Sequence, residues 1–441
     1  MQLDALQDQP LVPAGRPSRR HLVLRLEAPA AEKPAERPQL DLAVVVDRSG
    51  SMDGFPLACA LEGASRLPGL LHQDDRLAVV DFGSDIRVTL PPARMDERGR
   101  SRAEAALRSI QCHGCTDLHG GWRTGAETLE CLPRRNGDAG RDARVLVLSD
   151  GMGNRGITHP PHLAVEAAAM RGRGVLTTTV GVGNRYSTEQ LEALAFHGGG
   201  RMHRASDPEQ LIGLLAEELQ EVRATVAEML LADLSAPGGV RMRCLSACPE
   251  DHPGRWAAGA LVAGQKRDLV FQLDLPLLPA GESLEVGFSV SWCPPGSASR
   301  EFLVGMAAFT AVAGDDPRLE NWNTEAAAIV AQAWQSSLVR EGAFAHERGN
   351  HRAACAVLRA AEPELREYLK LLPEPLAWEL LREVEDLIQQ SRRSVLPQRH
   401  SKELLMMKAK RMRGERDLRW RRRSWTEIGP PDLPPQDHDD D

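Results

Sequence analysis

The chain has 441 residues, of which 42% are hydrophobic and 26% are charged, and its formal net charge is −8. This length predicts about three domains, and this composition excludes a wholly disordered chain, a collagen and a coiled-coil rod. No stretch reaches the ~18 consecutive apolar residues of a membrane helix, and the N-terminus lacks the apolar run of a signal peptide. We therefore expect a cytoplasmic protein whose eight cysteines are reduced thiols.

Residues 1–37 are expected to form a leader that contains one strand. Residues 1–20 predict a flexible segment, and residues 28–38 are rich in Pro and Ala, which is typical of a linker. Between them, His21–Leu26 alternates apolar and polar side chains, as a half-buried strand does. We hypothesise that this strand joins a β-sandwich predicted further along the chain, which would make the intervening unit an insertion.

Residues 38–222 alternate short apolar runs with segments of helical spacing. Strands that are buried on both faces and separated by helices predict the fold class α/β, with a doubly wound, mostly parallel sheet. The apolar runs are Leu42–Val46, Leu77–Phe82, Val145–Leu148 and Val175–Val182, and the helical segments are Leu57–Leu71, Arg102–Ser109, Gly121–Leu132, His162–Arg173, Ser187–Phe196 and Asp207–Glu221.

The remainder of the chain loses this alternation. Residues 223–312 have short alternating runs between Pro and Gly turns and predict an antiparallel β-sandwich. Residues 313–390 are helical, and small residues around a Gly turn within Gly342–Ala361 predict a helical hairpin. Residues 391–426 hold thirteen Lys and Arg against three acidic residues and predict a basic helix, followed by a disordered acidic tail at 427–441.

The basic helix has several candidate contacts. We expect it to lie on the acidic body of the same chain. A protein partner, nucleic acid or an anionic membrane are the alternatives, since Lys and Arg side chains attract phosphate and carboxylate groups alike.

Oxygen-bearing side chains follow two of the predicted strands. An aspartate and two serines, in the pattern Asp-x-Ser-x-Ser, directly follow the run Leu42–Val46, and a second aspartate follows the run Val145–Leu148. A threonine lies between them in the chain, in a loop before a helix. Because ligands bind at the carboxyl ends of strands in an open parallel sheet, we expect these side chains to converge. The candidate metal ligands are Asp47, Ser49, Ser51, Thr116 and Asp150.

The chemistry of this set favours a hard divalent cation. Carboxylates and hydroxyls suit Mg²⁺ or Mn²⁺, and suit Ca²⁺ less well because Ca²⁺ usually takes more ligands. Two carboxylates balance the charge of the ion while hydroxyls add none. A position left open on the ion would then accept a carboxylate from another molecule.

The same region resembles a von Willebrand factor type A domain with a metal-ion-dependent adhesion site. The resemblance covers Pro38–Val222 and implies that all five candidate ligands occupy the metal positions of the family. It also implies a non-enzymatic adaptor whose bound Mg²⁺ coordinates an Asp or Glu of a partner protein, with AAA+ ATPases or kinase/phosphatase systems as partners. The segments that carry it are Asp47–Met52, Gly114–Gly121, Leu148–Thr158, Gly181–Gly200 and Ser206–Leu211. The flanking regions resemble bacterial proteins labelled calcium-activated chloride channel-like, a label that fits poorly without a membrane helix.

Three other interpretations of the sequence are open. A phosphate-ester hydrolase with a nucleophilic Asp47 needs a second acid two residues later, where this chain has Ser49. A scaffold could bind partners through its C-terminal helices while the metal site stays idle. The pairs Cys112–Cys115 and Cys244–Cys248 have spacings that could bind a metal ion, and His113 and His119 could be further ligands of the first pair. The alternative is that these cysteines are small side chains packed in loops. No cofactor-binding or small-molecule substrate site is expected.

Overall fold

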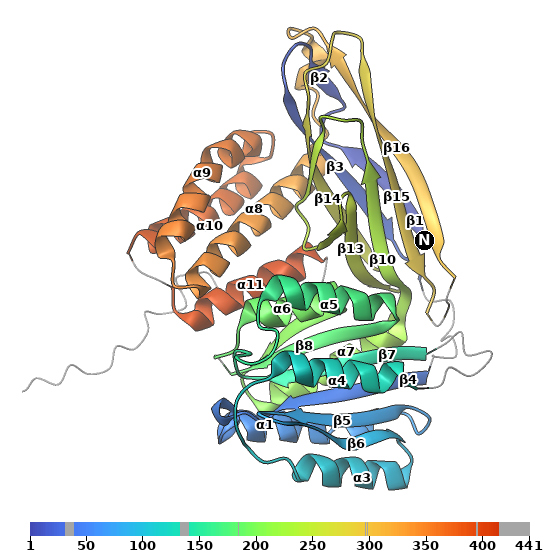
Figure 1. The fold of residues 1–441 in the computed structure, drawn as a ribbon. Coiled ribbons are helices and arrows are strands. Elements are labelled where there is room, and N and C mark those ends of the chain that lie inside the picture. Colours follow the sequence, from blue (N-terminus) through green and yellow to red (C-terminus); the bar gives the residue numbers. More distant parts are fainter. Residues whose placement is uncertain are drawn as a thin grey trace, which may run out of the picture.

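The computed structural model describes residues 1–30, 39–132, 141–183, 185–295, 297, 299–393 and 396–413. It contains an α/β domain, a β-sandwich and a group of C-terminal helices that lie against both (Figure 1). None of the helices in these ranges is both long enough and apolar enough to cross a lipid bilayer.

The α/β domain is built on a six-stranded sheet with the order β6-β5-β4-β7-β8-β9. Every neighbouring pair is parallel except β5 and β6, which are antiparallel. The prediction of an α/β fold with a mostly parallel sheet is confirmed. The strands are β4 (Gln39–Asp47), β5 (Arg76–Phe82), β6 (Ile86–Arg94), β7 (Arg141–Ser149), β8 (Val175–Val182) and β9 (Gly199–Ala205).

Helices cover both faces of this sheet, as the buried apolar runs require. One apolar core lies between the sheet and the helices α1, α3 and α7, and a second lies between the opposite face and α4, α5 and α6. At the centre of the second core Trp122 is fully buried, and its indole N–H donates to Thr177 Oγ1 at 3.0 Å. The helices are η1 (Gly50–Met52), α1 (Phe55–Ser65), α2 (Leu67–Leu70), α3 (Glu97–Arg108), α4 (Leu118–Glu130), α5 (Pro160–Gly172), α6 (Thr188–His197) and α7 (Pro208–Ala224).

Two strands of the sheet were not predicted from the sequence. β6 is an edge strand with two consecutive prolines, Pro91 and Pro92, a composition that the sheet interior excludes and an edge tolerates. β9 begins with two glycines and carries Arg201 and Arg204, so it lacks the apolar run that marked the other strands. Both lie at the edges of the sheet, where burial is incomplete and the sequence pattern is weak.

The β-sandwich consists of a four-stranded sheet, β1-β3-β14-β11, and a six-stranded sheet, β12-β13-β10-β15-β16-β2. Apolar side chains from both sheets fill the space between them. The strands are β1 (Gln2–Gln7), β2 (Leu11–Pro13), β3 (Ser18–Glu27), β10 (Thr225–Ser235), β11 (Arg241–Cys244), β12 (Glu250–His252), β13 (Arg255–Val262), β14 (Lys266–Leu275), β15 (Ser283–Cys293) and β16 (Glu301–Val312).

The expectation of a flexible leader with a single strand is wrong. The first 30 residues contribute three strands, β1, β2 and β3, to the two sheets of the sandwich. β3, which includes His21–Leu26, pairs with β14 from Ser18 opposite Leu275 to Glu27 opposite Lys266. The α/β domain therefore lies, along the chain, between two strands of the sandwich, β3 and β10.

The C-terminal helices pack around their own apolar core, to which β3 and β14 also contribute Val23 and Val270. The predicted hairpin corresponds to α8 and α9, and its turn contains Gly349, whose φ of 72° favours glycine. The elements are η2 (Pro317–Glu320), α8 (Thr324–Glu347), α9 (His351–Leu369), α10 (Glu374–Arg393) and α11 (Gln398–Met412).

The predicted start of the basic helix at residue 391 is wrong, because residues 391–393 still belong to α10 and a separate helix, α11, begins at Gln398. α11 is the described helix of the basic segment. It packs against α8, and two of its lysines, Lys402 and Lys408, are 1% and 0% exposed. Lys408 Nζ lies 2.5 Å from Glu383 Oε1 on α10, so its charge is neutralised inside the same chain. Residues 414–441, which include the rest of the basic segment and the predicted acidic tail, lie outside the described residues.

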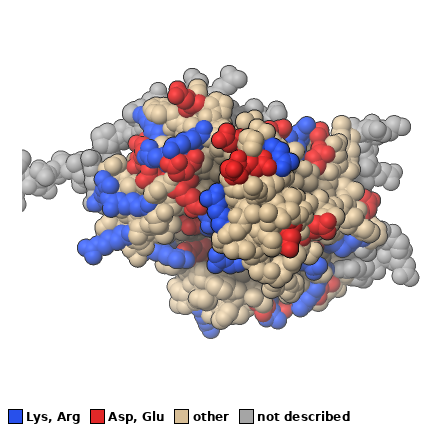
Figure 2. Space-filling model, turned by 90° about the horizontal axis from the view of Figure 1, so that it is seen from above, with Lys and Arg blue, Asp and Glu red and all other residues tan. Residues whose placement is uncertain are grey.

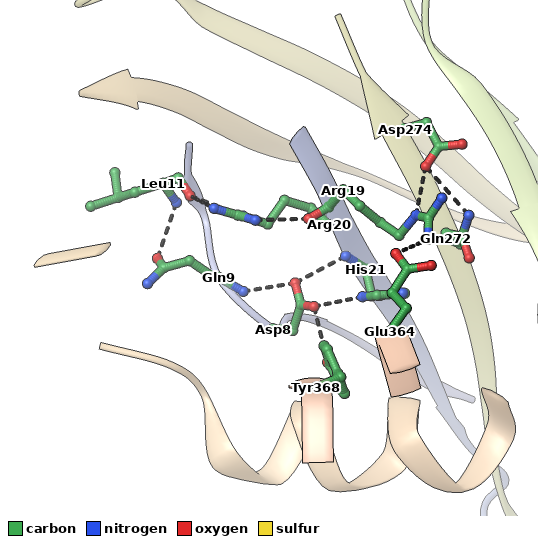
Figure 3. A network of polar contacts seen from close by, with 10 residues as sticks. All are labelled: Asp8, Gln9, Leu11, Arg19, Arg20, His21, Gln272, Asp274, Glu364 and Tyr368. Atoms are coloured by element: carbon green, nitrogen blue, oxygen red, sulfur yellow. Dashed lines mark hydrogen bonds and ion pairs between the residues drawn. The ribbon is translucent and has the colours of Figure 1, made fainter. Parts of the chain in front are cut away.

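A buried polar network joins the N-terminal strands to α9 (Figure 3). The Asp8 carboxylate contacts His21 Nδ1 at 2.6 Å and accepts hydrogen bonds from Tyr368 OH at 3.0 Å and from the backbone N–H groups of Gln9 and His21. Asp8 and His21 are 0% and 2% exposed. The first residues of the chain are thereby fixed to the helical region.

On the face of the molecule shown in Figure 2, basic side chains alternate with acidic ones. Among the described residues drawn there, no broad surface carries a single sign of charge. This face does not offer the continuous basic surface by which proteins bind nucleic-acid backbones.

Candidate metal site

The site begins where β4 ends. β4 lies between β5 and β7, and its last residue, Asp47, is fully buried at the carboxyl end of the sheet. The Ser49 backbone N–H donates to Asp47 Oδ1 at 2.8 Å, which turns the chain away from the strand and into η1. Gly50 N–H then donates to the Gly114 carbonyl at 2.8 Å and fixes this turn to the loop that carries Thr116.

The second carboxylate reaches the site from β7. Because β4 and β7 are parallel neighbours, with Val46 opposite Leu148, the residues that follow both strands emerge side by side. The Ser51 hydroxyl donates to Asp150 Oδ1 at 2.9 Å, and Ser51 Oγ lies 3.1 Å from Ser49 Oγ.

Thr116 completes the group from a third segment, the loop before α4. Its backbone N–H donates to Asn154 Oδ1 at 3.1 Å, and Asn154 N–H donates back to the Thr116 carbonyl at 3.0 Å. A Cβ atom placed on Gly151 would lie 3.1 Å from Ser51 Oγ, 3.4 Å from Thr116 Oγ1 and 3.5 Å from Asp47 Oδ2. Oxygens from all three segments therefore converge beside Gly151, where a side chain would block the space.

Burial of two acidic groups shifts the titration of both. Burial raises the pKa of Asp47 to about 6, although hydrogen bonds from Ser149 and Ser49 favour its charged form, and the nearby Asp150 raises it further. Burial also raises the pKa of Asp150, against the opposing effects of Ser51 and Arg185. Two partly desolvated carboxylates close together are stabilised by a cation between them.

The donor set fits a divalent metal ion. Two carboxylates and three hydroxyls provide only hard oxygen donors, which Mg²⁺, Mn²⁺ and Ca²⁺ prefer. The guanidinium in the middle of the motif does not enter the site: Arg48 is 1% exposed and turns towards Asp81 and towards Asp85, whose Oδ1 lies 2.5 Å from Arg48 Nη2. Arg48 thus fixes the turn to β5 and the following loop.

Three supporting residues were missed by the sequence analysis. The Ser149 hydroxyl donates to Asp47 Oδ2 at 2.5 Å, and Asn154 holds the Thr116 loop. Gln190 on α6 holds the segment after Asp150: its Oε1 accepts from Gly153 N–H at 2.8 Å, and its Nε2 donates to the carbonyls of Gly153 and Thr158. Ser149 could have been suspected from its position beside Asp150, but nothing in the sequence pattern connects Gln190 with a loop 37 residues earlier.

The cysteines and histidines near the site do not gather into a metal cluster. Cys112 Sγ donates to the Ser49 carbonyl at 2.8 Å, whereas Cys115 is exposed. His119 is buried on α4 with its ring 6.0 Å from that of Trp122, and His113 lies at the surface. Within the described residues, no group of three or more His, Cys, Asp or Glu side chains has metal-binding geometry.

Comparison with known proteins agrees with this architecture. Residues 41–219 match the model of the von Willebrand factor type A domain family. Residues 41–219 therefore form a von Willebrand factor type A domain. Domains of this family commonly act as protein-interaction modules and typically bind a divalent metal at an adhesion site.

Relatives extend the similarity beyond this domain. The chain is 27% identical over 230 residues to the uncharacterized protein sll0103 of Synechocystis, a match that covers 51% of this chain and 52% of that protein. It thus spans about half the length of this curated relative.

Two solved structures share the fold over most of this chain. A von Willebrand factor type A protein from Catenulispora acidiphila aligns with a TM-score of 0.65 and 18% identity, over 92% of this chain and 96% of that chain. The ArnB paralog VWA2 from Sulfolobus acidocaldarius aligns with a TM-score of 0.61 and 17% identity, over 93% of this chain and 97% of that chain. At these identities the similarity concerns the fold alone.

Proposed function

We propose that this chain is a non-enzymatic protein-binding module that depends on a divalent metal ion. The convergence of oxygens from three segments beside Gly151 is the observation that carries the proposal. In this proposal Mg²⁺, with Mn²⁺ and Ca²⁺ as alternatives, is held at the site, and an Asp or Glu carboxylate of a partner protein is a further ligand. The residues that would hold the ion are Asp47, Ser49, Ser51, Thr116 and Asp150.

The residues of the chain prepare this site for an incoming anion. The Ser149 hydroxyl and the Ser49 backbone N–H orient the two oxygens of Asp47, and Ser51 orients Asp150. When bound, the ion supplies an electrophilic position for a carboxylate oxygen. Because only two carboxylates come from the chain, they balance the charge of a divalent ion without an excess that would repel the partner's acidic side chain.

Metal binding is the first test. Isothermal titration of the metal-free full chain with Mg²⁺ and Mn²⁺ is expected to show one site, which Asp47→Asn abolishes while far-ultraviolet circular dichroism stays unchanged. Asp53→Asn is the matched control, because Asp53 is an exposed acid of the same segment outside the ligand set. Equal affinities in the wild type and Asp47→Asn would refute the proposal.

The open ligand position is the second test, with acetate as the probe for a partner's carboxylate. Mn²⁺ bound to the wild type is expected to broaden the acetate methyl resonance by paramagnetic relaxation, and Asp47→Asn is expected to remove the specific part of this effect. A chain that binds Mn²⁺ but causes no such broadening would hold a closed structural ion, which contradicts a role in carboxylate capture.

A hydrolase would behave differently. Incubation of the Mg²⁺- or Mn²⁺-loaded chain with p-nitrophenyl phosphate is expected to release no nitrophenol above the level of Asp47→Asn. If the wild type hydrolyses the phosphate ester and Asp47→Asn does not, the chain is a phosphate-ester hydrolase and the proposal of a non-enzymatic binding module is wrong.

A further inference from the structure

Most of β16 forms an open edge of the β-sandwich. β15 pairs with it on one side from residue 301 to residue 310, and the register is continuous. On the other side β2 pairs only with residues 310–312. Among the strands that the structure describes, none pairs with residues 301–309 on that side, and Figure 1 shows β16 at the border of the sandwich. The six-stranded sheet therefore ends at this stretch of β16.

The backbone groups of every second residue of β16 point to this open edge. Thr310 N–H donates away from β15, to the Pro10 carbonyl at 3.0 Å. Two residues earlier, the Ala308 carbonyl accepts a hydrogen bond from Gln7 Nε2 at 2.7 Å. A strand without a bulge points its peptide groups to alternate sides, so this direction continues at every second residue towards the start of β16. The residues of the open stretch that share it are Phe302, Val304 and Met306.

The same three residues carry exposed apolar side chains. Phe302 and Val304 are each 69% exposed, and Met306 is 61% exposed. Their neighbours on the same face of β15 are too small to cover them. These neighbours are Ser291, Ser289 and Gly287. Phe302, Val304 and Met306 thus form an apolar stripe, the β16 stripe, directly beside unpaired backbone groups.

The open stretch lacks the features that usually protect an edge strand. Such strands commonly carry Lys or Pro, or are interrupted by a bulge, so that no further strand can pair with them. Residues 302–308 of β16 contain neither a charged residue nor a proline, and no bulge interrupts their pairing with β15. By contrast β6, an edge strand of the α/β sheet, contains Pro91 and Pro92 and has register shifts against β5. The β16 edge is therefore available for pairing.

A second copy of the same chain fits this edge. In an antiparallel pair with Val304 opposite Val304 of the second copy, every residue of the β16 stripe would exchange backbone hydrogen bonds with the other copy. Phe302 of each copy would lie opposite Met306 of the other, so the ring and the thioether would cover each other. This pair has two-fold symmetry, and an uncharged stripe does not repel its own copy.

We propose that two copies of this chain form a symmetric dimer by antiparallel pairing of their β16 edges around Val304. The pairing joins the two six-stranded sheets into one continuous sheet. A strand of another protein would be selected by pockets or charged groups beside the edge, and the small residues of β15 provide neither. A contact of one strand pair lies near the lower size limit of specific interfaces, about 1,000 Å² in total, so we expect a reversible dimer with a micromolar dissociation constant.

The test is sedimentation velocity of the full chain over a range of micromolar concentrations. It is run without added metal, since β16 lies outside the metal site. The wild type is expected to shift towards twice the monomer mass as the concentration rises. Val304→Lys and Val304→Glu are each expected to stay monomeric, because like charges would face each other, and an equimolar mixture of the two variants is expected to dimerise again. Val165→Lys is the matched control, since Val165 on α5 is also 69% exposed, and it should dimerise as the wild type does.

Cross-linking tests the register. In the full chain with the exposed Cys115 and Cys131 replaced by serine, Val304→Cys is expected to form a disulfide-linked dimer on oxidation. The Cα atoms of such an opposed pair lie about 5.5 Å apart, within the range of a disulfide. Phe302→Cys is expected to stay unlinked, because its two copies would lie about 13 Å apart along the strands.

Two outcomes overturn the proposal. A wild type that remains monomeric at every concentration leaves the β16 edge to a strand of another protein. A dimer that persists in Val304→Lys is formed by a different surface. Circular dichroism of each variant shows whether the fold is retained, which we expect because the substituted side chains lie at the surface.

Discussion

Arg340 on α8 and Glu192 on α6 form a two-point ion pair, with Nη2 2.9 Å from Oε2 and Nη1 3.2 Å from Oε1. The side chains are only 11% and 7% exposed. The same guanidinium donates to the Leu405 carbonyl on α11 at 3.1 Å and lies over the rings of Phe196 and Phe344. One side chain thus joins the α/β domain to two of the C-terminal helices.

We expect Arg340→Ala to lower the free energy of unfolding by about 3–5 kcal/mol, since it leaves the buried Glu192 carboxylate without its partner. Urea unfolding of Arg340→Ala, Glu192→Ala and the double variant measures the coupling energy between the two side chains, which we expect to be about 1–3 kcal/mol. Arg348→Ala, which removes a more exposed ion pair between the residue that follows α8 and Glu189 of α6, is the control and should cost below ~1 kcal/mol. Additive effects of the two buried positions would contradict the coupling.

The Asp8 network predicts a second stability effect. Asp8→Ala removes the acceptor of His21, Tyr368 and two backbone N–H groups, and should cost about 3–5 kcal/mol because it leaves several buried donors unpaired. Tyr368→Phe removes one donor and should cost about 1 kcal/mol. Urea unfolding checks both, and equal costs for the two variants would show that Asp8 does not organise the network.

Glu218 on α7 predicts an acid-dependent effect. Burial raises its pKa, but Arg201, His203 and Arg144, together with a hydrogen bond from His203 whose Nε2 lies 2.7 Å from Oε1, outweigh burial and lower it below the ordinary 4.5. A carboxyl group with a lowered folded-state pKa binds its proton more readily in the unfolded state. Its stabilisation is therefore complete above about pH 4.5 and is lost as the pH falls through the folded-state value.

The measurement compares the wild type with Glu218→Gln by urea unfolding at several pH values. The wild type is expected to be more stable at pH 7 by about 3 kcal/mol, and the difference should shrink below pH 4.5. A difference that is independent of pH would show that the carboxylate charge contributes nothing.

Gln190 is expected to affect metal affinity without contributing a ligand. Its amide holds both the carbonyl and the N–H of Gly153, three residues after Asp150. Gln190→Ala should weaken Mg²⁺ binding about 10–100-fold, the range found for residues that orient metal ligands. Gln210→Ala on α7 is the matched control. Isothermal titration measures the Mg²⁺ affinity of each variant. An unchanged affinity in Gln190→Ala would show that the position of the Gly153 loop does not affect metal binding.

The α/β domain could be predicted in large part because its signals are local. The bounds predicted for the strand at Val175–Val182 are those of β8, since a strand buried on both faces is rich in apolar and β-branched residues, here Val, Leu and Thr. The Asp-x-Ser-x-Ser turn could be placed at the carboxyl edge because it directly follows such a run. The edge strands β6 and β9 were missed, since partial exposure removes the pattern.

The amino-acid sequence by itself determined the four inner strands of the doubly wound sheet, β5, β4, β7 and β8, and the oxygen-bearing residues that are candidates for one metal site. The pattern of His21–Leu26 predicted a strand of the sandwich, and its pairing with β14 confirms this. Only the tertiary structure decided that β1 and β2, earlier in the chain, belong to the sandwich as well. It also decided that Lys402 and Lys408 are buried and that Lys408 pairs with Glu383. The periodicity of apolar residues shows which side of a single helix or strand is buried, whereas these features depend on which elements, distant in the sequence, pack together.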